Sequence, residues 1–233
     1  MVTPRFVELL YTEAKAGNYD IIRASFIREN SKGADVMMSS TDNVITWMHG
    51  KIYRVAYLKE KDIHFLPELR VDEDAYFNMV AINSTKKVGL IQEPVYIWRD
   101  YKNSLTRQGR QSEYFRNSYY CFIFGQVQAL IKIYELNGTI VPELVANVLK
   151  QVYYHYMTAR FYQADEAQLD EALGLLKNKQ WMQQWLLEGS NWINIVNTIK
   201  AGAVYDNKIV AFYQETFNVW ANRLLKGEVH EQL

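Results

Sequence analysis

Three acidic residues in a row, Asp72, Glu73 and Asp74, stand directly before a run of aromatic and aliphatic residues. Carboxylates in such a position can cap a helix, bind a divalent cation, or accept a proton as a general base. The apolar residues that follow have helical spacing, so a helix is predicted to begin at these acids. Asp72 would be its N-cap, and the other two would lie in the first turn, where the helix dipole favours negative charge. This structural role alone accounts for all three acids.

Asp74 differs from the other two acids in its spacing. It stands three residues before Phe77 and seven before Ala81, which places it on the helix face that packs against the core. Burial there raises the pKa of a carboxyl and makes it a competent proton acceptor. Asp72 and Asp74 also match an Asp-x-Asp metal motif, but Pro67 interrupts the segment where a strand should lead into such a motif. We therefore assign no metal ligand in this chain.

Short helical and strand patterns alternate up to about residue 107, which indicates an α/β layer. Thr3 is predicted to cap the first helix, with Pro4 at its first position and Gly17 at its end. Pro94 lies near the junction of the last two strands and confines the second to an edge or a strand start. The predicted order is a helix over residues 3–18, a strand over 19–27, a short strand or turn leading into a helix over 44–62, and two short strands over 86–100.

Helical patterns fill residues 112–226 almost without interruption, so we predict an α/β domain over residues 1–107 and an all-α domain over residues 108–233. Asn137-Gly138 is predicted to end one helix, Pro142 to begin the next, and Asp165 to cap a third. The many aromatic residues of this region are typical of helix-bundle packing. A groove for an acceptor polymer and an oligomer interface remain alternatives, whereas a membrane-surface helix is disfavoured because no strongly basic face is present.

Composition excludes several classes of protein. Lys+Arg and Asp+Glu are equal at 26 each, so no overall field attracts nucleic acid, and we predict no nucleic-acid partner. A single cysteine, Cys121, excludes an internal disulfide and fits a reducing compartment. The first residues do not form a signal peptide, and no apolar run is long enough to span a bilayer. We expect a cytoplasmic protein, with peripheral membrane contact left open.

Four short patterns follow one another in a fixed order over some sixty residues, and together they resemble the acceptor half of family 2 glycosyltransferases of the GT-A fold. None of the four is specific alone; the order is what carries the resemblance. The patterns are Trp47 followed by Lys51-Ile52-Tyr53-Arg54, then Ile63-His64-Phe65, which would form a strand, then Glu73-Asp74 with Phe77, and last Tyr96, Trp98 and Arg99 followed by Ser104 and Thr106.

The resemblance implies a role for several of these residues. Asp74 would be the general base that takes the proton from an acceptor hydroxyl as that oxygen attacks the anomeric carbon of a nucleotide sugar with inversion, and Glu73 would help to place the acceptor or the pair. Donor-diphosphate contacts would come from Arg99, Ser104 and Thr106. The acceptor would contact Trp47 and Lys51. A core position is an equally ordinary interpretation of Trp47, and a residue such as Lys51 more often belongs to a solvated helix face than to a binding site.

The resemblance also implies a nucleotide-binding first half that ends in an acidic motif for Mn²⁺ or Mg²⁺. Residues 2–26 resemble the run that follows this motif, so roughly the first hundred residues of such a domain are expected to lie outside this sequence. We therefore expect no cofactor within this chain, and Mn²⁺ or Mg²⁺ only where the donor half is supplied. A second chain carrying that half, a degenerate remnant and a shortened chain are the alternatives.

Three functions are consistent with these observations. The first is an inverting glycosyltransferase, or its acceptor-side portion, acting with a nucleotide sugar on a glycan or surface polymer. The second is a catalytically silent carbohydrate-binding or assembly protein derived from such an enzyme. The third is an unrelated α+β interaction protein in which the acids only cap a helix. Replacement of Asp74 by Asn separates them, because only the first requires this carboxylate for transfer.

Overall fold

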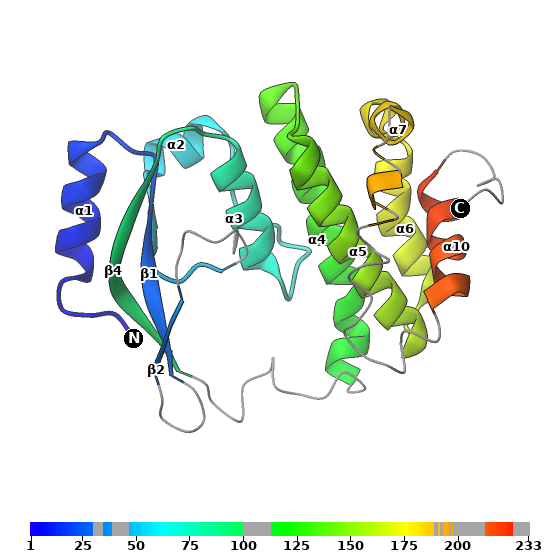
Figure 1. Ribbon diagram of the computed structural model, residues 1–233, viewed down its shortest axis with the longest axis horizontal. Helices are drawn as coiled ribbons and strands as arrows, with labels where there is room; N and C mark the ends of the chain where they lie inside the picture. The colour runs from blue at the N-terminus through cyan, green and yellow to red at the C-terminus, as the bar shows by residue number, and fades with distance from the viewer. Residues whose placement is uncertain are drawn as a thin grey trace. The chain divides into compact units, whose positions relative to one another are not determined.

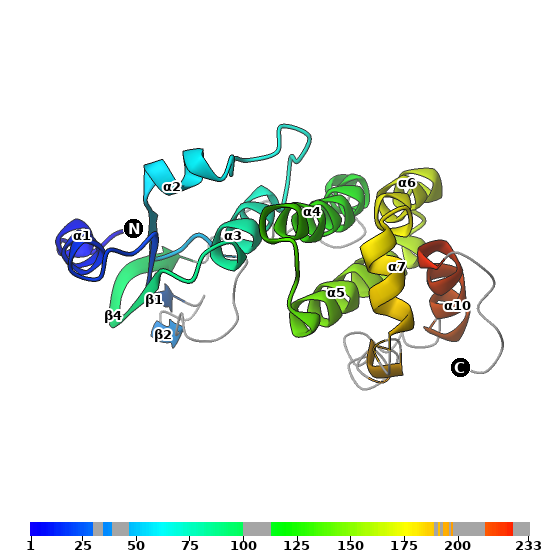
Figure 2. The ribbon, with the colours of Figure 1, turned by 90° about the horizontal axis from the view of Figure 1, so that it is seen from above.

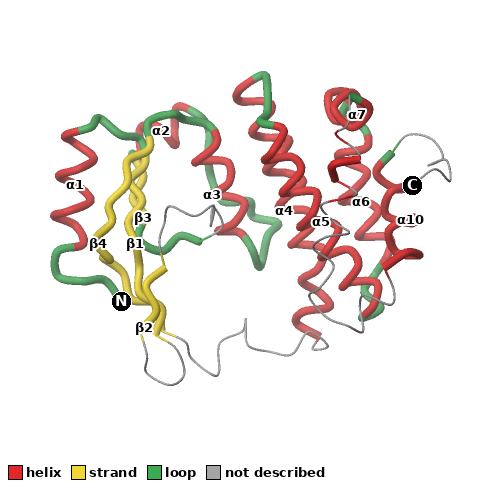
Figure 3. The backbone as a smooth tube through the Cα atoms, in the orientation of Figure 1, coloured by secondary structure: helices red, strands yellow, loops and turns green. Residues whose placement is uncertain are grey.

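The computed structural model describes residues 1–29, 35–38, 47–99, 113–188, 191, 193–195, 197 and 213–225. The chain divides into two compact units. One unit comprises Met1–Pro67 and Glu73–Gln108, and the other comprises Glu68–Asp72 and Gly109–Leu233. Within the described residues, all strands belong to the first unit, while the second consists of helices and their connections (Figure 3). An α/β layer followed by a helical part is thus confirmed, whereas the predicted boundary at 107/108 lies outside the described residues.

The sheet of the first unit is organised around strand β1 (Ile21–Glu29), which pairs with each of the other described strands. The other strands are β2 (Asp35–Met38), β3 (Lys51–Tyr53) and β4 (Val88–Arg99). β4 runs parallel to β1 along its whole length, so β2 and β3, both antiparallel, share the other edge of β1. Helix α1 (Phe6–Ala16) covers one face of this sheet and α3 (Glu73–Asn83) the other, while α2 (Val55–Glu60) follows β3 (Figures 1 and 2).

The core beneath α1 is made by alternate residues of β1. Ile22 and Ala24 pack with Leu10 and Val95, and all four are fully buried. Because successive side chains of a strand point to opposite faces, Arg23 is directed to the face covered by α3. Burying this cluster stabilises the layer by the usual hydrophobic contribution of about 1.5–3 kcal/mol for each large aliphatic side chain.

The start of α1 differs from the prediction. The helix begins at Phe6 with Arg5 as its N-cap, rather than at Thr3 and Pro4. The reason is that Thr3 donates its backbone N–H to the carbonyl of Val95 at 2.9 Å, which ties residues 1–3 to the outer edge of β4. The predicted end of the helix at Gly17 is confirmed.

β4 corrects a second expectation, because one strand of twelve residues replaces the two short strands predicted for this region. The pairing passes from Ala24–Ile91 to Ser25–Pro94 and Phe26–Tyr96, so β4 carries extra residues around Pro94. Such a bulge accommodates proline, which cannot donate to the ladder, without ending the strand.

The helical unit begins with α4 (Glu113–Asn137), α5 (Pro142–Phe161), α6 (Glu166–Lys177) and α7 (Gln180–Leu187), and α10 (Tyr213–Leu224) follows later in the chain. The helix end at Asn137-Gly138 is confirmed, with Gly138 at a φ of +69°. So are the start at Pro142 and the cap at Asp165, whose carboxylate accepts from the N–H of Ala167 at 2.9 Å.

Aromatic side chains of the helical unit pack against one another inside it. Trp220 of α10 is fully buried and meets Tyr153 and Phe217 edge to face or tilted, and Trp181 stacks on Tyr134. These contacts favour bundle packing over a polymer groove. Across the described helices, none has the length and apolar character needed to cross a membrane.

Candidate functional site

The acid cluster lies where β3 approaches the start of α3. The helix begins at Glu73, so Asp72 occupies the predicted cap position, but with a φ of +63° rather than the extended backbone usual for an N-cap. Glu73 is exposed, Asp74 is half-buried, and every residue from Ala75 to Ala81 is buried. Of the two first-turn acids, Asp74 is therefore the one directed toward the protein interior.

Burial raises the pKa of the Asp74 carboxyl, and the negative charge of Glu73 raises it further. Hydrogen bonds from the backbone N–H groups of Asp74 and Ala75, together with the charge of Lys51, act in the opposite direction without cancelling the increase. A carboxylate with a raised pKa is a stronger proton acceptor than an exposed one. The geometry at the helix start is thus suited to a general base.

Strand β3 supplies the groups that face Asp74. Tyr53 donates a hydrogen bond to the side-chain amide oxygen of Asn78, and its ring meets Phe77 edge to face at 5.2 Å between centroids. Lys51, two residues earlier on the same face of β3, interacts electrostatically with Asp74 and donates from Nζ to the carbonyl of Trp47. The structure therefore brings Glu73, Asp74 and Lys51 close to one another.

Phe65 also reaches this region, although the segment that contains it is not a strand. Residues 61–72 form turns and loop, whereas the family pattern implied a strand at Ile63-His64-Phe65. The Phe65 ring stacks on Phe77 with centroids 4.5 Å apart and planes 13° apart. The loop thus covers the helix without pairing with the sheet.

Arg23 is a residue of this site that the sequence analysis missed. It is the register partner of Lys51 across β1 and β3, and burial lowers the pKa of both side chains, that of Lys51 to about 8. We call Arg23 and Lys51 the cation pair. The sequence did contain a signal for Arg23. It stands between the apolar residues Ile22 and Ala24 in a strand, so its side chain points to the face opposite theirs.

Five rings border the cation pair on the side of Trp47. Trp47 lies 5.7 Å from Trp98, and His49 stacks on Tyr96 at 4.9 Å between centroids. Burial lowers the pKa of His49 to about 4, with smaller effects of the charges of Lys51 and the N-terminus, so this imidazole is neutral near pH 7. The ring of Phe26 is buried, and the other four rings are half-buried. The ring cluster comprises Phe26, Trp47, His49, Tyr96 and Trp98.

The residues predicted to contact the donor diphosphate lie elsewhere or outside the described part. Arg99 ends β4 and forms an ion pair with Glu29 at 2.9 Å. Glu29 stands six residues beyond Arg23 along β1, which corresponds to about 20 Å of extended strand. The structure thus separates Arg99 from the cation pair along the sheet. Ser104 and Thr106 lie outside the described residues.

Arg54, a residue of the family pattern, has a structural partner. Its guanidinium contacts Asp20 with Nη2 at 2.7 Å from Oδ1, and Thr85 donates to the other carboxylate oxygen at 2.6 Å. Burial would raise the pKa of Asp20, but the hydrogen bonds from Thr85 and Arg54 and the charges of Arg54 and Lys87 hold it below its ordinary value. This contact fixes the start of β1 against the start of α2.

The described residues contain no group of three His, Cys, Asp or Glu side chains arranged to hold a metal ion. At the acid cluster the charge balance also opposes a cation, because Asp74 faces Lys51 and the latter pairs with Arg23. The residues of this site therefore do not fit Mn²⁺ or Mg²⁺, and no chemical step is assigned to a metal here.

Comparison with known proteins relates the chain to one fold. No protein-family model and no curated protein matches the sequence. Among solved structures, S. aureus TarS 1–349, a glycosyltransferase, in complex with UDP-GlcNAc is similar at a TM-score of 0.52 and 16% identity, over 92% of this chain and 65% of the TarS chain. A longer S. aureus TarS structure matches at a TM-score of 0.47 and 15% identity, over 85% of this chain and 37% of that one. This chain therefore spans less than two thirds of the length of the neighbours it matches. The first of these likenesses shows that this chain shares the fold of the TarS structure.

Proposed function

We propose that this chain forms the acceptor side of an inverting glycosyltransferase of the GT-A type and family 2. In the reaction, Asp74 accepts the proton of an acceptor hydroxyl while that oxygen bonds to the anomeric carbon of a nucleotide sugar. The bond from that carbon to the diphosphate oxygen breaks on the opposite side, and the nucleoside diphosphate leaves. The product is a glycoside of opposite anomeric configuration, and Glu73 assists in holding the acceptor.

The observation that carries this proposal is the half-buried carboxylate of Asp74, with its raised pKa, at the start of α3 and opposite β3. The dipole and the backbone N–H groups at a helix start lower the pKa of a carboxyl that only caps the helix. Asp74 has the opposite shift, because burial and Glu73 outweigh those effects. A functional role for the carboxylate accounts for this energetically unfavourable placement.

The donor side is a separate part of the proposal. TarS is bound to UDP-GlcNAc in the similar structure, which supports a uridine diphosphate sugar as the donor to test first. We expect Arg99, Ser104 and Thr106 to contact its diphosphate, and a nucleotide-binding half, on a second chain or elsewhere, to supply Mn²⁺ or Mg²⁺. A cytoplasmic site fits this donor, and a glycan or surface polymer is the proposed acceptor.

The test uses extracts of the native host from which the gene for this chain has been deleted, so that any second chain is present. Purified wild-type chain is added with radiolabelled UDP-GlcNAc, and label incorporated into polymer is counted. We expect wild-type chain to restore incorporation and Asp74→Asn to leave it at least about a hundred-fold lower. Asp62→Asn, an exposed acid in the loop before α3, serves as the matched control and should restore transfer. Full transfer by Asp74→Asn would remove the general-base assignment.

Carbohydrate binding without transfer is the second candidate, and the ring cluster favours it. Half-buried Trp and Tyr faces provide apolar surfaces on which sugar rings stack. Glycan binding by the wild-type chain, with no incorporation of label in the complemented extract, would support this function instead. Loss of glycan binding in Trp47→Ala would locate it at the cluster.

A further inference from the structure

The cation pair is an unfavourable arrangement in the folded chain by itself. Arg23 and Lys51 are directly opposite each other on antiparallel strands, where Cβ atoms lie about 4.5–5.5 Å apart and like charges destabilise the sheet. Both side chains are also partly removed from water, which lowers the pKa of each. Two apolar residues at these positions would avoid both costs, and the neighbouring register pair, Ile22 and Ile52, is apolar.

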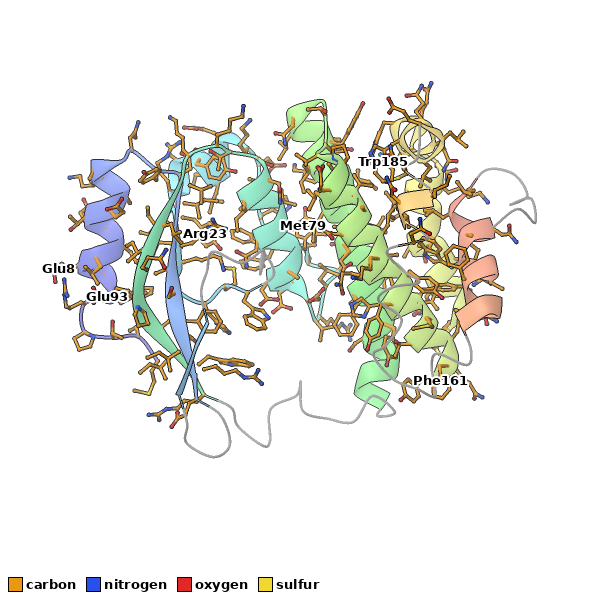
Figure 4. The ribbon with its side chains drawn as sticks, in the orientation of Figure 1. Glu8, Arg23, Met79, Glu93, Phe161 and Trp185 are labelled. Carbon is orange, nitrogen blue, oxygen red and sulfur yellow. The ribbon has the colours of Figure 1, made fainter. Side chains whose placement is uncertain are left out.

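The hydrogen-bonding capacity of the pair is largely unused by the described residues. The Nε of Arg23 is buried without a hydrogen-bond partner among them, and no ion pair within 4.0 Å joins either cation to a described acid. Lys51 uses one of its three donors on the carbonyl of Trp47. Figure 4 shows Arg23 on the side of β1 that faces α3. Lys51, its cross-strand partner, interacts electrostatically with Asp74 at the start of that helix.

We infer that the acceptor of this chain carries an oxyanion, a phosphate or a carboxylate, next to the hydroxyl that Asp74 deprotonates, and that Arg23 and Lys51 bind this oxyanion. This inference rests on the proposed function. An arginine fork and an adjacent ammonium match the geometry and the charge of either anion. Asp74 then faces the hydroxyl, while the two cations offset the repulsion between its carboxylate and the anionic acceptor.

The leaving diphosphate of the donor is a less suitable occupant. In an inverting displacement the attacking and leaving oxygens stand on opposite sides of the anomeric carbon, so groups beside the base lie on the acceptor side. Lys51 interacts with Asp74, and Arg23 is its cross-strand partner. The ring cluster continues from Trp47 on the same side and can stack on the sugar of such an acceptor.

The experiment is a calorimetric titration of the full chain with three probes of matched length: maltotriose, trigalacturonic acid and a glycerol phosphodiester trimer. We expect the two anionic trimers to bind about ten-fold or more tightly than maltotriose. The tighter of the two identifies the anion as carboxylate or phosphate. Equal affinity for all three probes, or no binding of any, would overturn the inference.

Variants then separate charge recognition from loss of structure. Arg23→Gln and Lys51→Met should each lower the affinity for the anionic trimer about ten-fold or more and leave maltotriose unaffected. Arg23→Lys retains the charge and should keep most of the preference, even where Arg23→Gln reduces stability. Arg5→Gln, which replaces the exposed arginine at the N-cap of α1, is the control and should bind like wild type. Equal losses for charged and neutral probes would indicate a structural role and contradict the inference.

Asp74→Asn distinguishes this inference from the general-base proposal. Removing the carboxylate beside the cations should raise the affinity for the anionic trimer, because one repulsive charge is lost. Higher affinity in Asp74→Asn together with retained transfer would reject the base and keep the oxyanion site. Abolished transfer in Asp74→Asn, together with no preference of the chain for charged trimers, would keep the general base and reject the oxyanion site.

Discussion

The hydroxyl of Tyr53 donates a hydrogen bond to the side-chain amide oxygen of Asn78, which joins β3 to α3 one helical turn beyond Asp74. Lys51 precedes Tyr53 by two residues, and Asp74 precedes Asn78 by four, so each pair shares a face of its own element. The same strand and helix thus make two contacts in parallel, one uncharged and one electrostatic. The uncharged contact positions the candidate base.

Replacing Tyr53 by Phe is expected to lower the free energy of unfolding by about 1–2 kcal/mol, because the buried Asn78 side chain loses this partner. Transfer should also fall by about ten-fold or more, since the start of α3 is held less firmly over β3. Urea denaturation and the complemented-extract assay measure the two effects.

Tyr57→Phe is the matched control for this prediction. Its hydroxyl donates to the carbonyl of Ala81 at 2.6 Å, on the same helix but two turns beyond Asp74. We expect a similar loss of stability and nearly unchanged transfer. Equal losses of transfer in both variants would mean that general destabilisation of α3, rather than positioning of Asp74, explains the effect.

Asp74→Asn should leave the free energy of unfolding at neutral pH unchanged or higher. The pKa of Asp74 is raised in the folded chain, so folding disfavours its ionised form at every pH above that value, and a neutral amide removes this cost. Urea denaturation of both forms at pH 7 tests the sign. A variant less stable than wild type would show that the carboxylate mainly caps the helix.

The affinity for trigalacturonic acid is expected to decrease as the pH rises through about 8, where Lys51 loses its proton. Burial and the charge of Arg23 lower this pKa, and Asp74 opposes them; Arg23 itself stays charged, and His49 is already neutral. Lys51→Met should bind weakly, with an affinity that does not change across this range. A wild-type affinity independent of pH would contradict the assignment of Lys51.

The lowered pKa of Lys51 also affects stability: as the pH rises, the free energy of unfolding should increase while the affinity for the anionic trimer decreases. Because the pKa of Lys51 is lower in the folded chain than the ordinary 10.5, folding disfavours its charged form. The contribution of Lys51 to the free energy of unfolding therefore increases as the pH rises from about 8 toward 10.5. This change should be absent from the denaturation curves of Lys51→Met.

Asp20→Asn is expected to destabilise the chain by about 2 kcal/mol at pH 7, because charge-assisted hydrogen bonds from Arg54 and Thr85 are weakened. The pKa of Asp20 is lowered in the fold, so its contribution is complete above the unfolded value near 3.9 and is lost as the pH falls through the folded value. Unfolding curves of wild type and variant should therefore converge in acid.

Glu8→Gln provides the comparison for Asp20. Glu8 is 72% exposed and lies 3.9 Å from Arg5 on the surface of α1, so its replacement should change the free energy of unfolding by less than about 0.5 kcal/mol. A loss in Glu8→Gln equal to that in Asp20→Asn would show that burial of the acid is unimportant.

Local sequence patterns predicted the parts of the site that depend on helical spacing. The offsets of Asp74 to Phe77 and Ala81 predicted that it lies at the edge of the core, and the structure places it half-buried at the start of α3. The ends of helices at Gly17 and Asn137-Gly138 likewise followed from local chemistry, and Gly138 has the positive φ that glycine adopts without strain.

Features that depend on strand pairing could not be predicted in this way. The pairing of Arg23 with Lys51 requires the register between two strands separated by 21 residues, which no local pattern contains. The helix start at Thr3 was wrong for a related reason, because the N–H of Thr3 is used by Val95 of β4. Long-range hydrogen bonding overrides a local capping preference.

The extra residues around Pro94 make chain length, rather than residue identity, a determinant of the ring cluster. Val95 is fully buried against Ala24 and Leu10, yet the next residue, Tyr96, belongs to the cluster. Because strand faces alternate, loss of a single codon in this bulge would exchange the two faces for every later residue of β4. A point mutation changes one of the rings that β4 contributes to the ring cluster, whereas a three-nucleotide deletion would turn all of them away from the cluster together.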